Sequence, residues 1–139
     1  MQSIVVITPS HITLKDFVKK LHPYYDVDRV SDDRIVVYDG ERYIAINLDE
    51  YLTEEYDEEE LKVISQIQKQ PTFFLIEFSH FDFLTEAIPL CVDDPGFLID
   101  TDHSDILSGR EFLLKLKKNP RWDWRIKSGV RTVSVDKSG

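Results

Sequence analysis

The residue types best suited to chemistry lie together in the run Asp100–Asp105, which reads Asp-Thr-Asp-His-Ser-Asp. Carboxylates and an imidazole in one short loop are ligands that a hard cation or Zn²⁺ accepts. The spacing departs from that of an EF-hand loop, because its sixth position requires glycine and here holds Asp105. One interpretation is a strand-to-helix loop whose Asp and Ser side chains accept backbone N–H groups. The other is a small metal-binding domain or hydrolase that uses Asp100, Asp102, His103 and Asp105.

Other catalytic patterns are absent from the sequence, which has no Gly-rich phosphate loop, HExxH, CxxC or Gly-x-Ser-x-Gly motif. Glu77 and Asp82 are a possible acid–base pair, but nothing in the sequence brings them together. The single cysteine, Cys91, stands between Leu90 and Val92, an apolar setting that favours an inert structural thiol. The scattered histidines (His11, His22 and His80) are interpreted as packed or capping residues. The sequence therefore predicts a protein that is not an enzyme and has no cofactor.

The densest chemical feature is a run of negative charge, with eight carboxylates and no base among residues 49–60. Tyr51, Leu52 and Tyr56 are interleaved with these acids. Aromatic contact area beside carboxylates is typical of a surface that binds a basic protein, although a solvated loop that only maintains solubility has the same composition. The candidate partner-binding residues are Asp49, Glu50, Tyr51, Glu54, Glu55, Tyr56, Asp57, Glu58 and Glu59. A second, weaker acidic patch consists of Asp100, Asp102 and Asp105.

The whole chain is also acidic, with 26 Asp and Glu against 17 Lys and Arg and a formal charge of −9. Such a net anion repels phosphate backbones, so direct nucleic-acid binding is not expected. A chain of 139 residues with 42% apolar residues suffices for one domain with a core. A lone cysteine, no leader-like start and no apolar run of membrane-spanning length predict a cytoplasmic location away from membranes.

Hydrophobic periodicity and helix caps predict the elements that position these residues. Strands are expected at Ile4–Ile7, Tyr25–Val30, Arg34–Tyr38, Arg42–Ile46, Thr72–Phe78, Phe97–Ile99 and Val130–Val135. Helices are expected from Thr13 to Leu21, Asp57 to Lys69, Phe81 to Ile88 and Ser108 to Lys118. Pro89 is expected to block the third of these. The pattern predicts a single α+β domain over residues 1–139, with a mixed or antiparallel sheet, three to four helices and a disordered end.

The C-terminal third resembles a known group of proteins. The matching segments are Phe97–His103, Ser108–Leu113 and the run from Asn119 through Trp122-Asp123-Trp124, which lie within a stretch of about 30 of the 139 residues. This pattern resembles immunity proteins of contact-dependent growth inhibition and related polymorphic-toxin systems, small acidic bacterial proteins encoded beside toxins. The resemblance implies a non-catalytic antitoxin that binds one cognate toxin domain, often a nuclease, and occludes its active site or substrate groove. The group shares neither one fold nor common functional residues, so the resemblance assigns no position of this chain.

Three functional hypotheses follow. The first is an immunity protein whose acidic surface neutralises a basic toxin domain. The second is the metal-binding domain or hydrolase built on the run from Asp100 to Asp105. The third is an acidic adaptor for some other basic protein. The tryptophans of the Trp122–Trp124 run are interpreted as packing residues, with a ligand-stacking platform as the alternative.

Overall fold

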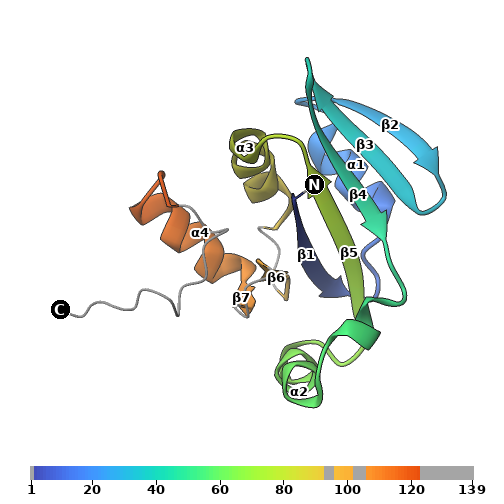
Figure 1. Ribbon diagram of the computed structural model, residues 1–139, viewed down its shortest axis with the longest axis vertical. Helices are drawn as coiled ribbons and strands as arrows, with labels where there is room; N and C mark the ends of the chain where they lie inside the picture. The colour runs from blue at the N-terminus through green and yellow to red at the C-terminus, as the bar shows by residue number, and fades with distance from the viewer. Residues whose placement is uncertain (1, 93–95, 102–105, 123–139) are drawn as a thin grey trace.

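The computed structural model describes residues 2–92, 96–101 and 106–122. Over these residues the chain has the predicted α+β class, with a seven-stranded antiparallel sheet in the order β2-β3-β4-β5-β1-β6-β7 (Figure 1). The strands are β1 (Gln2–Pro9), β2 (Asp26–Ser31), β3 (Arg34–Asp39), β4 (Arg42–Leu48), β5 (Pro71–Phe78), β6 (Leu98–Asp100) and β7 (Ile106–Ser108). The helices are α1 (Leu14–Leu21), the 3₁₀ helix η1 (Leu52–Glu55), α2 (Glu58–Ile67), α3 (Phe81–Cys91) and α4 (Gly109–Lys118). The predicted strand Val130–Val135 lies outside the described residues.

Strand β1 lies in the interior of the sheet, between β5 and β6, as its β-branched run from Ile4 to Ile7, buried on both faces, requires. It pairs along its whole length with β5, from Gln2 opposite Phe78 to Pro9 opposite Pro71. Its other edge pairs with β6. Proline has no N–H to donate to a ladder, so the facing prolines Pro9 and Pro71 end the hydrogen-bonded pairing of β1 with β5.

The strands β2, β3 and β4 form the predicted hairpins. Asp39-Gly40-Glu41 connects β3 to β4, and Gly40 has a φ of +65°, the left-handed conformation that such a turn requires. Strand β2 is the exposed edge of the sheet. The sequence pattern therefore predicted both the hairpin and the edge strand correctly.

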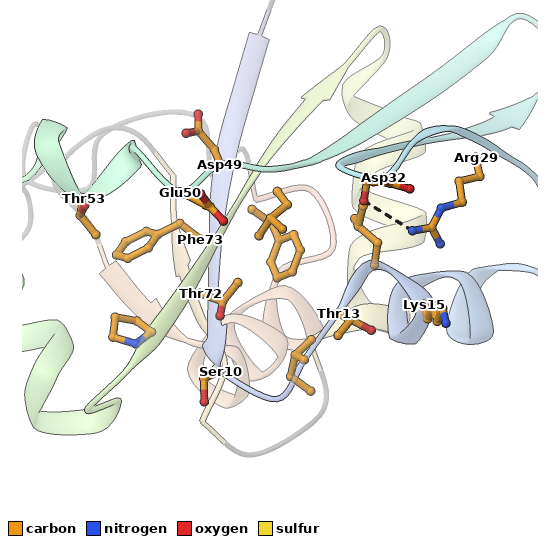
Figure 2. Close-up of a pocket in the computed structure, with 15 residues that line it drawn as sticks. Ser10, Thr13, Lys15, Arg29, Asp32, Asp49, Glu50, Thr53, Thr72 and Phe73 are labelled. Carbon is orange, nitrogen blue, oxygen red and sulfur yellow. Dashed lines mark hydrogen bonds between the residues drawn. The ribbon is translucent and has the colours of Figure 1, made fainter.

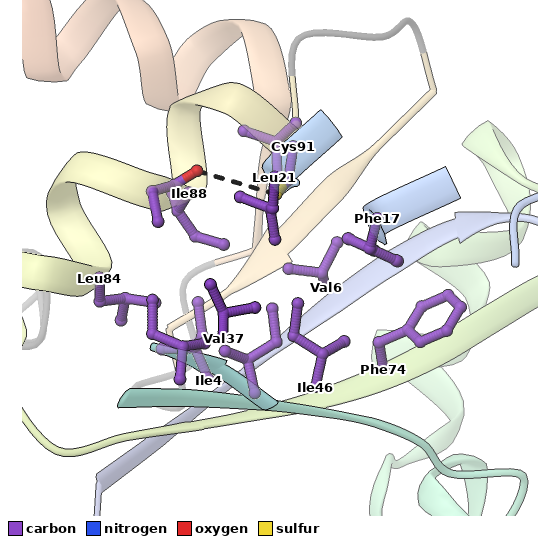
Figure 3. Close-up of a cluster of buried hydrophobic side chains, with 14 of the residues drawn as sticks. Ile4, Val6, Phe17, Leu21, Val37, Ile46, Phe74, Leu84, Ile88 and Cys91 are labelled. Carbon is purple, nitrogen blue, oxygen red and sulfur yellow. Dashed lines mark hydrogen bonds between the residues drawn. The ribbon is translucent and has the colours of Figure 1, made fainter. Parts of the chain in front are cut away.

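Helices α1, α3 and α4 pack on one face of the sheet and enclose the main hydrophobic core. Its buried side chains include Val6, Phe17, Ile46, Phe74, Leu84 and Ile88 (Figure 3). Cys91 belongs to the same core, where its thiol lies 3.7 Å from the carbonyl oxygen of Ala87, as the prediction of a structural cysteine requires. Trp122 packs on the edge of this core, with its ring 5.6 Å from that of Phe112.

The opposite face is only partly covered. Helices η1 and α2 lie over a smaller cluster whose buried members are Val5, Ile7, Leu52, Ile64, Phe73 and Leu98. Farther along the same face, on β3, β4 and β5, polar side chains replace this cluster. There the Arg34 guanidinium donates to Asn47 Oδ1 at 2.7 Å and to Glu77 Oε1 at 3.3 Å.

One expectation about local structure is wrong, and one strand was not predicted. Helix α3 continues through Pro89 to Cys91, because the following N–H, that of Val92, bonds to the Ile88 carbonyl and Cys91 and Val92 are buried in the core. The missing proline N–H costs one helical bond, and burial of the last turn offsets that loss. A short strand that the sequence pattern did not predict, β7, precedes α4 and pairs with β6. Among the described residues no helix combines the length and apolar character needed to cross a bilayer.

An arginine clasp joins the β3–β4 hairpin to α3. The guanidinium of Arg42 bonds to Asp39, lies 3.1 Å from Glu86 Oε2 and 3.3 Å from Asp82 Oδ2, and sits 5.0 Å from the centroid of Phe83. The hydrogen bond with Asp39 does most to raise the pKa of the guanidinium. Arg42 therefore pairs with three carboxylates and so fixes the hairpin against the helix.

Replacement of Tyr25 by Phe is expected to remove part of the alkaline instability of the protein. The ring of Tyr25 packs edge-on against Phe83, and burial, followed by the charges of Glu86 and Asp39, raises the pKa of its phenol above 10.0. The phenol therefore ionises more readily in the unfolded chain, so its contribution to stability is intact below about pH 10 and is lost as the pH rises through the folded-state pKa. Urea unfolding between pH 8 and 11 should show a steeper decline for the wild type, and equal slopes would contradict this expectation.

Candidate partner-binding surface and adjoining pocket

The acidic segment, residues 49–60, is anchored to the sheet by the apolar residues within it. Leu52 of η1 is 5% exposed and packs into the smaller cluster. The ring of Tyr56 lies 5.5 Å from that of Phe73, and its hydroxyl donates to Asp100 Oδ2 at 2.6 Å. Because these contacts join the segment to β5 and β6, its carboxylates project from a fixed surface rather than from a loose loop.

The acids near the start of α2 also have a local reason to be there. Asp57 caps the helix, since its Oδ1 accepts the N–H of Glu60 at 2.8 Å while the Glu60 side chain accepts the N–H of Asp57 at 3.1 Å. The predicted capping box is therefore present. Negative charge in a first helical turn is stabilised by the helix dipole, so Glu58 and Glu59 need no cationic neighbour.

The remaining acids of the segment face solvent. Glu50, Glu54, Glu55, Glu58 and Glu59 are exposed, and within residues 2–92, 96–101 and 106–122 no salt bridge engages them. Tyr51 stands among them with 73% of its surface exposed. Asp49 accepts the N–H of Tyr51 at 3.0 Å and so shapes the entry to η1. The segment thus presents carboxylates whose charge is not neutralised by the rest of the described chain.

An apolar pair on α2 adjoins these acids. The expected apolar face of this helix (Leu61, Val63, Ile64 and Ile67) is buried in full only at Ile64. Val63 is 47% exposed and Ile67 is 51% exposed, and a spacing of four residues places them together on one side of the helix. Helix α2 lies beside the start of β5, toward one end of the sheet (Figure 1). An exposed apolar pair rimmed by charge has the composition of a protein interface.

The structure assigns different roles to the predicted site residues. Glu50, Tyr51, Glu54, Glu55, Glu58 and Glu59 are exposed, whereas Tyr56 and Asp57 serve as anchor and helix cap. Asp100 is only 7% exposed and bonded to Tyr56, so its expected place on an open acidic patch is wrong. Asp102, His103 and Asp105 lie outside the described residues, as do Asp123 and Trp124. No cluster of potential metal ligands occurs in the part of the chain that the structure describes.

The other candidate chemical groups are separated or used structurally. Glu77 pairs with Arg34, while Asp82 pairs with Arg42, so the two carboxylates do not form a catalytic pair. His22 and His80 stand at helix-cap positions, but both are exposed, and the His80 side chain makes no capping hydrogen bond. His80 Nδ1 lies 2.8 Å from Ser79 Oγ.

A pocket of about 590 Å³ borders the acidic segment, where β1 ends and β5 begins (Figure 2). Its volume falls in the range of roughly 300–1,000 Å³ typical of ligand sites. Its wall comes from the loop before η1, the start of α1, the turn after β2 and the start of β5. The polar and charged side chains in that wall are Ser10, Thr13, Lys15, Arg29, Asp32, Asp49, Glu50, Thr53 and Thr72. Sequence reasoning missed this pocket because four separated segments build it.

Replacement of Tyr56 by Phe is expected to destabilise the protein by about 1.5–3 kcal/mol, the range for a hydrogen bond to a charged group. The substitution removes the hydroxyl that donates to the buried Asp100 carboxylate but keeps the ring against Phe73. The matched control is Tyr51→Phe, which removes a hydroxyl from a largely exposed ring and should stay within about 0.5 kcal/mol of the wild type. Urea unfolding of both variants measures the difference, and equal stabilities would show that the Tyr56 hydroxyl is not an anchor.

Comparison with known proteins gives no relative. No protein-family model, no curated protein and no solved structure matches the chain.

Proposed function

We propose that this chain is a bacterial immunity protein that acts in the cytoplasm and neutralises a basic toxin domain by occlusion. The C-terminal resemblance to immunity proteins supplies the class of partner. The acidic segment supplies the surface that would meet it. In this proposal the protein makes and breaks no covalent bond, and tight binding alone accounts for its activity.

The observation that carries the proposal is the combination of unneutralised carboxylates and exposed apolar groups on one anchored region. Glu54, Glu55 and Glu58 are exposed without salt bridges among the described residues. The neighbouring exposed apolar groups are Tyr51, Val63 and Ile67. Apolar contact supplies binding energy at the centre of an interface, and charge around it selects a cationic partner. A merely solvated acidic loop would not require the exposed apolar pair of α2.

A nuclease toxin suits this surface for an electrostatic reason. An enzyme that cleaves nucleic acid presents cationic groups to phosphates, and a fixed array of carboxylates can occupy the same groups. Complementary charge also raises association rates to roughly 10⁸–10⁹ M⁻¹s⁻¹ at low salt. Rapid capture protects a cell, because the toxin is bound before it reaches its substrate.

Co-expression with the toxin domain encoded by the neighbouring upstream gene tests the function. The chain is expected to restore growth of cells that produce this domain and to purify with it as a stoichiometric complex. An unrelated toxin domain of similar charge serves as the specificity control. Failure to restore growth, with both proteins produced in soluble form and no complex formed, would refute the proposed function.

A further inference from the structure

The pocket beside the acidic segment is polarised. Asp49 and Glu50 lie on one side of it, whereas Lys15 and Arg29 lie on the other, together with Asp32 (Figure 2). The Glu50 carboxylate is turned toward Phe73 and Thr72, while that of Asp49 points away from them. Glu50 has no salt bridge among the described residues, and Asp49 is engaged with the N–H of Tyr51. Of the three carboxylates in the wall, Asp32 lies beside Arg29 and Asp49 accepts a backbone N–H, so Glu50 is the one that lies away from the two basic residues and bears no such bond.

The rest of the wall suits a long side chain with a charged end. The partly exposed Ile12, Leu48 and Pro71 supply apolar surface, and the hydroxyl-bearing Thr53 and Thr72 line the same pocket. An aliphatic stem gains from such apolar surroundings, and a planar cation at its tip is matched by a carboxylate. Lys15 and Arg29 disfavour a cation at their own end, so they direct it toward Glu50.

We propose that this pocket receives an arginine side chain of the protein partner, with the guanidinium paired to the Glu50 carboxylate. The identity of that partner rests on the proposed function, whereas the preference of the pocket is a property of this chain alone. Arginine is favoured over lysine because its planar guanidinium presents two parallel N–H groups to a carboxylate. Arginine side chains seated in pockets are also frequent centres of binding energy in protein interfaces.

Titration of the isolated chain with N-acetyl-L-arginine amide, followed by ¹H–¹⁵N NMR, tests the pocket directly. Saturable shifts are expected at Glu50, Thr53 and Thr72. The citrulline analogue, which keeps the shape but lacks the charge, should bind at least about fivefold more weakly, and so should the lysine analogue. Glu50→Gln should weaken arginine binding by a similar factor. Glu41→Gln is the matched control, because Glu41 is an exposed acid at the opposite end of β4.

Three results would overturn the assignment. They are equal binding of the arginine and citrulline analogues, shifts confined to residues outside the pocket, and unchanged arginine affinity in the folded Glu50→Gln variant. Preferential binding of acetate or N-acetyl-glutamate amide at Lys15 and Arg29 would likewise assign the pocket to an anion. These outcomes concern the pocket alone, so they leave the growth-protection test of the proposed function independent. Conversely, if the wild-type chain binds the arginine analogue but does not protect growth, the proposed function is refuted while the arginine preference of the pocket stands.

Discussion

Reversal of Glu54, Glu55 and Glu58 to lysine should lower affinity for the toxin domain by about 100-fold or more and remove most of its dependence on ionic strength. All three side chains are exposed on η1 and the first turn of α2, where they bear no fold-stabilising salt bridge among the described residues. Each substitution changes the charge by two, so the formal net charge moves from −9 to −3. The main loss is expected in the association rate, measured by stopped-flow mixing at several salt concentrations.

The matched control applies the same change of net charge to another surface. Asp26, Asp28 and Glu41 are exposed on β2 and the β3–β4 turn, away from the acidic segment. Their reversal to lysine should reduce affinity far less than reversal of the first set. Similar losses for both triple variants would show that total charge, rather than this surface, drives binding. Wild-type affinity in the first variant would rule out the acidic segment as the interface.

Replacement of Phe74 by Ala should destabilise the protein by about 3–5 kcal/mol, the usual cost of removing a buried aromatic ring. Phe74 is completely buried, and its ring lies 4.8 Å from that of Phe17 in an edge-on arrangement. The cavity opens between the sheet and α1, where secondary structure on both sides limits relaxation. Urea unfolding measures the loss, and Phe74→Leu, which keeps most of the volume, should lose clearly less.

The neighbouring residue on β5 separates stability from binding. Phe73 points to the opposite face of the sheet, where it contacts Tyr56 below the acidic segment. Phe73→Ala should therefore reduce both stability and toxin affinity, because it loosens the anchor of the carboxylates. Phe74→Ala should leave the affinity of the folded fraction nearly unchanged. Equal effects of the two variants on affinity would show that the anchoring of the acidic segment is unimportant for binding.

The sequence predicted local structure well wherever the cause was local. Ser108 and Glu111 form the expected capping box at α4, and Asp57 with Glu60 does so at α2. Asp39-Gly40 makes the expected turn. These features depend on residues within four positions of one another, so their types and spacing are sufficient. Pro89 did not end α3, because tertiary burial of the last helical turn outweighed the local effect of the proline.

The candidate site was predictable in composition but not in geometry. The density of carboxylates between Asp49 and Glu60 is visible in the sequence. Burial of Leu52 beside an exposed Tyr51 is not, because it depends on how η1 meets the sheet. Likewise, apolar residues at helical spacing normally indicate a buried face, and the exposure of Val63 and Ile67 follows only from the place of α2. Asp100 shows the opposite case: its sequence suggested an exposed acid, but a hydrogen bond from Tyr56, which is distant in the sequence, holds it in a buried position.

The central position of β1 has a consequence for how the chain folds during synthesis. Strand β1 must wait for β5, whose pairing residues begin at Pro71, and then for β6, whose pairing residues end at Asp100. By contrast, β2, β3 and β4 can pair with their immediate neighbours as soon as each leaves the ribosome. Pairing between strands so distant in sequence predicts folding in milliseconds to seconds rather than microseconds. Until then the apolar run of β1 lacks both of its neighbouring strands, and an unpaired apolar strand of this kind is prone to aggregate.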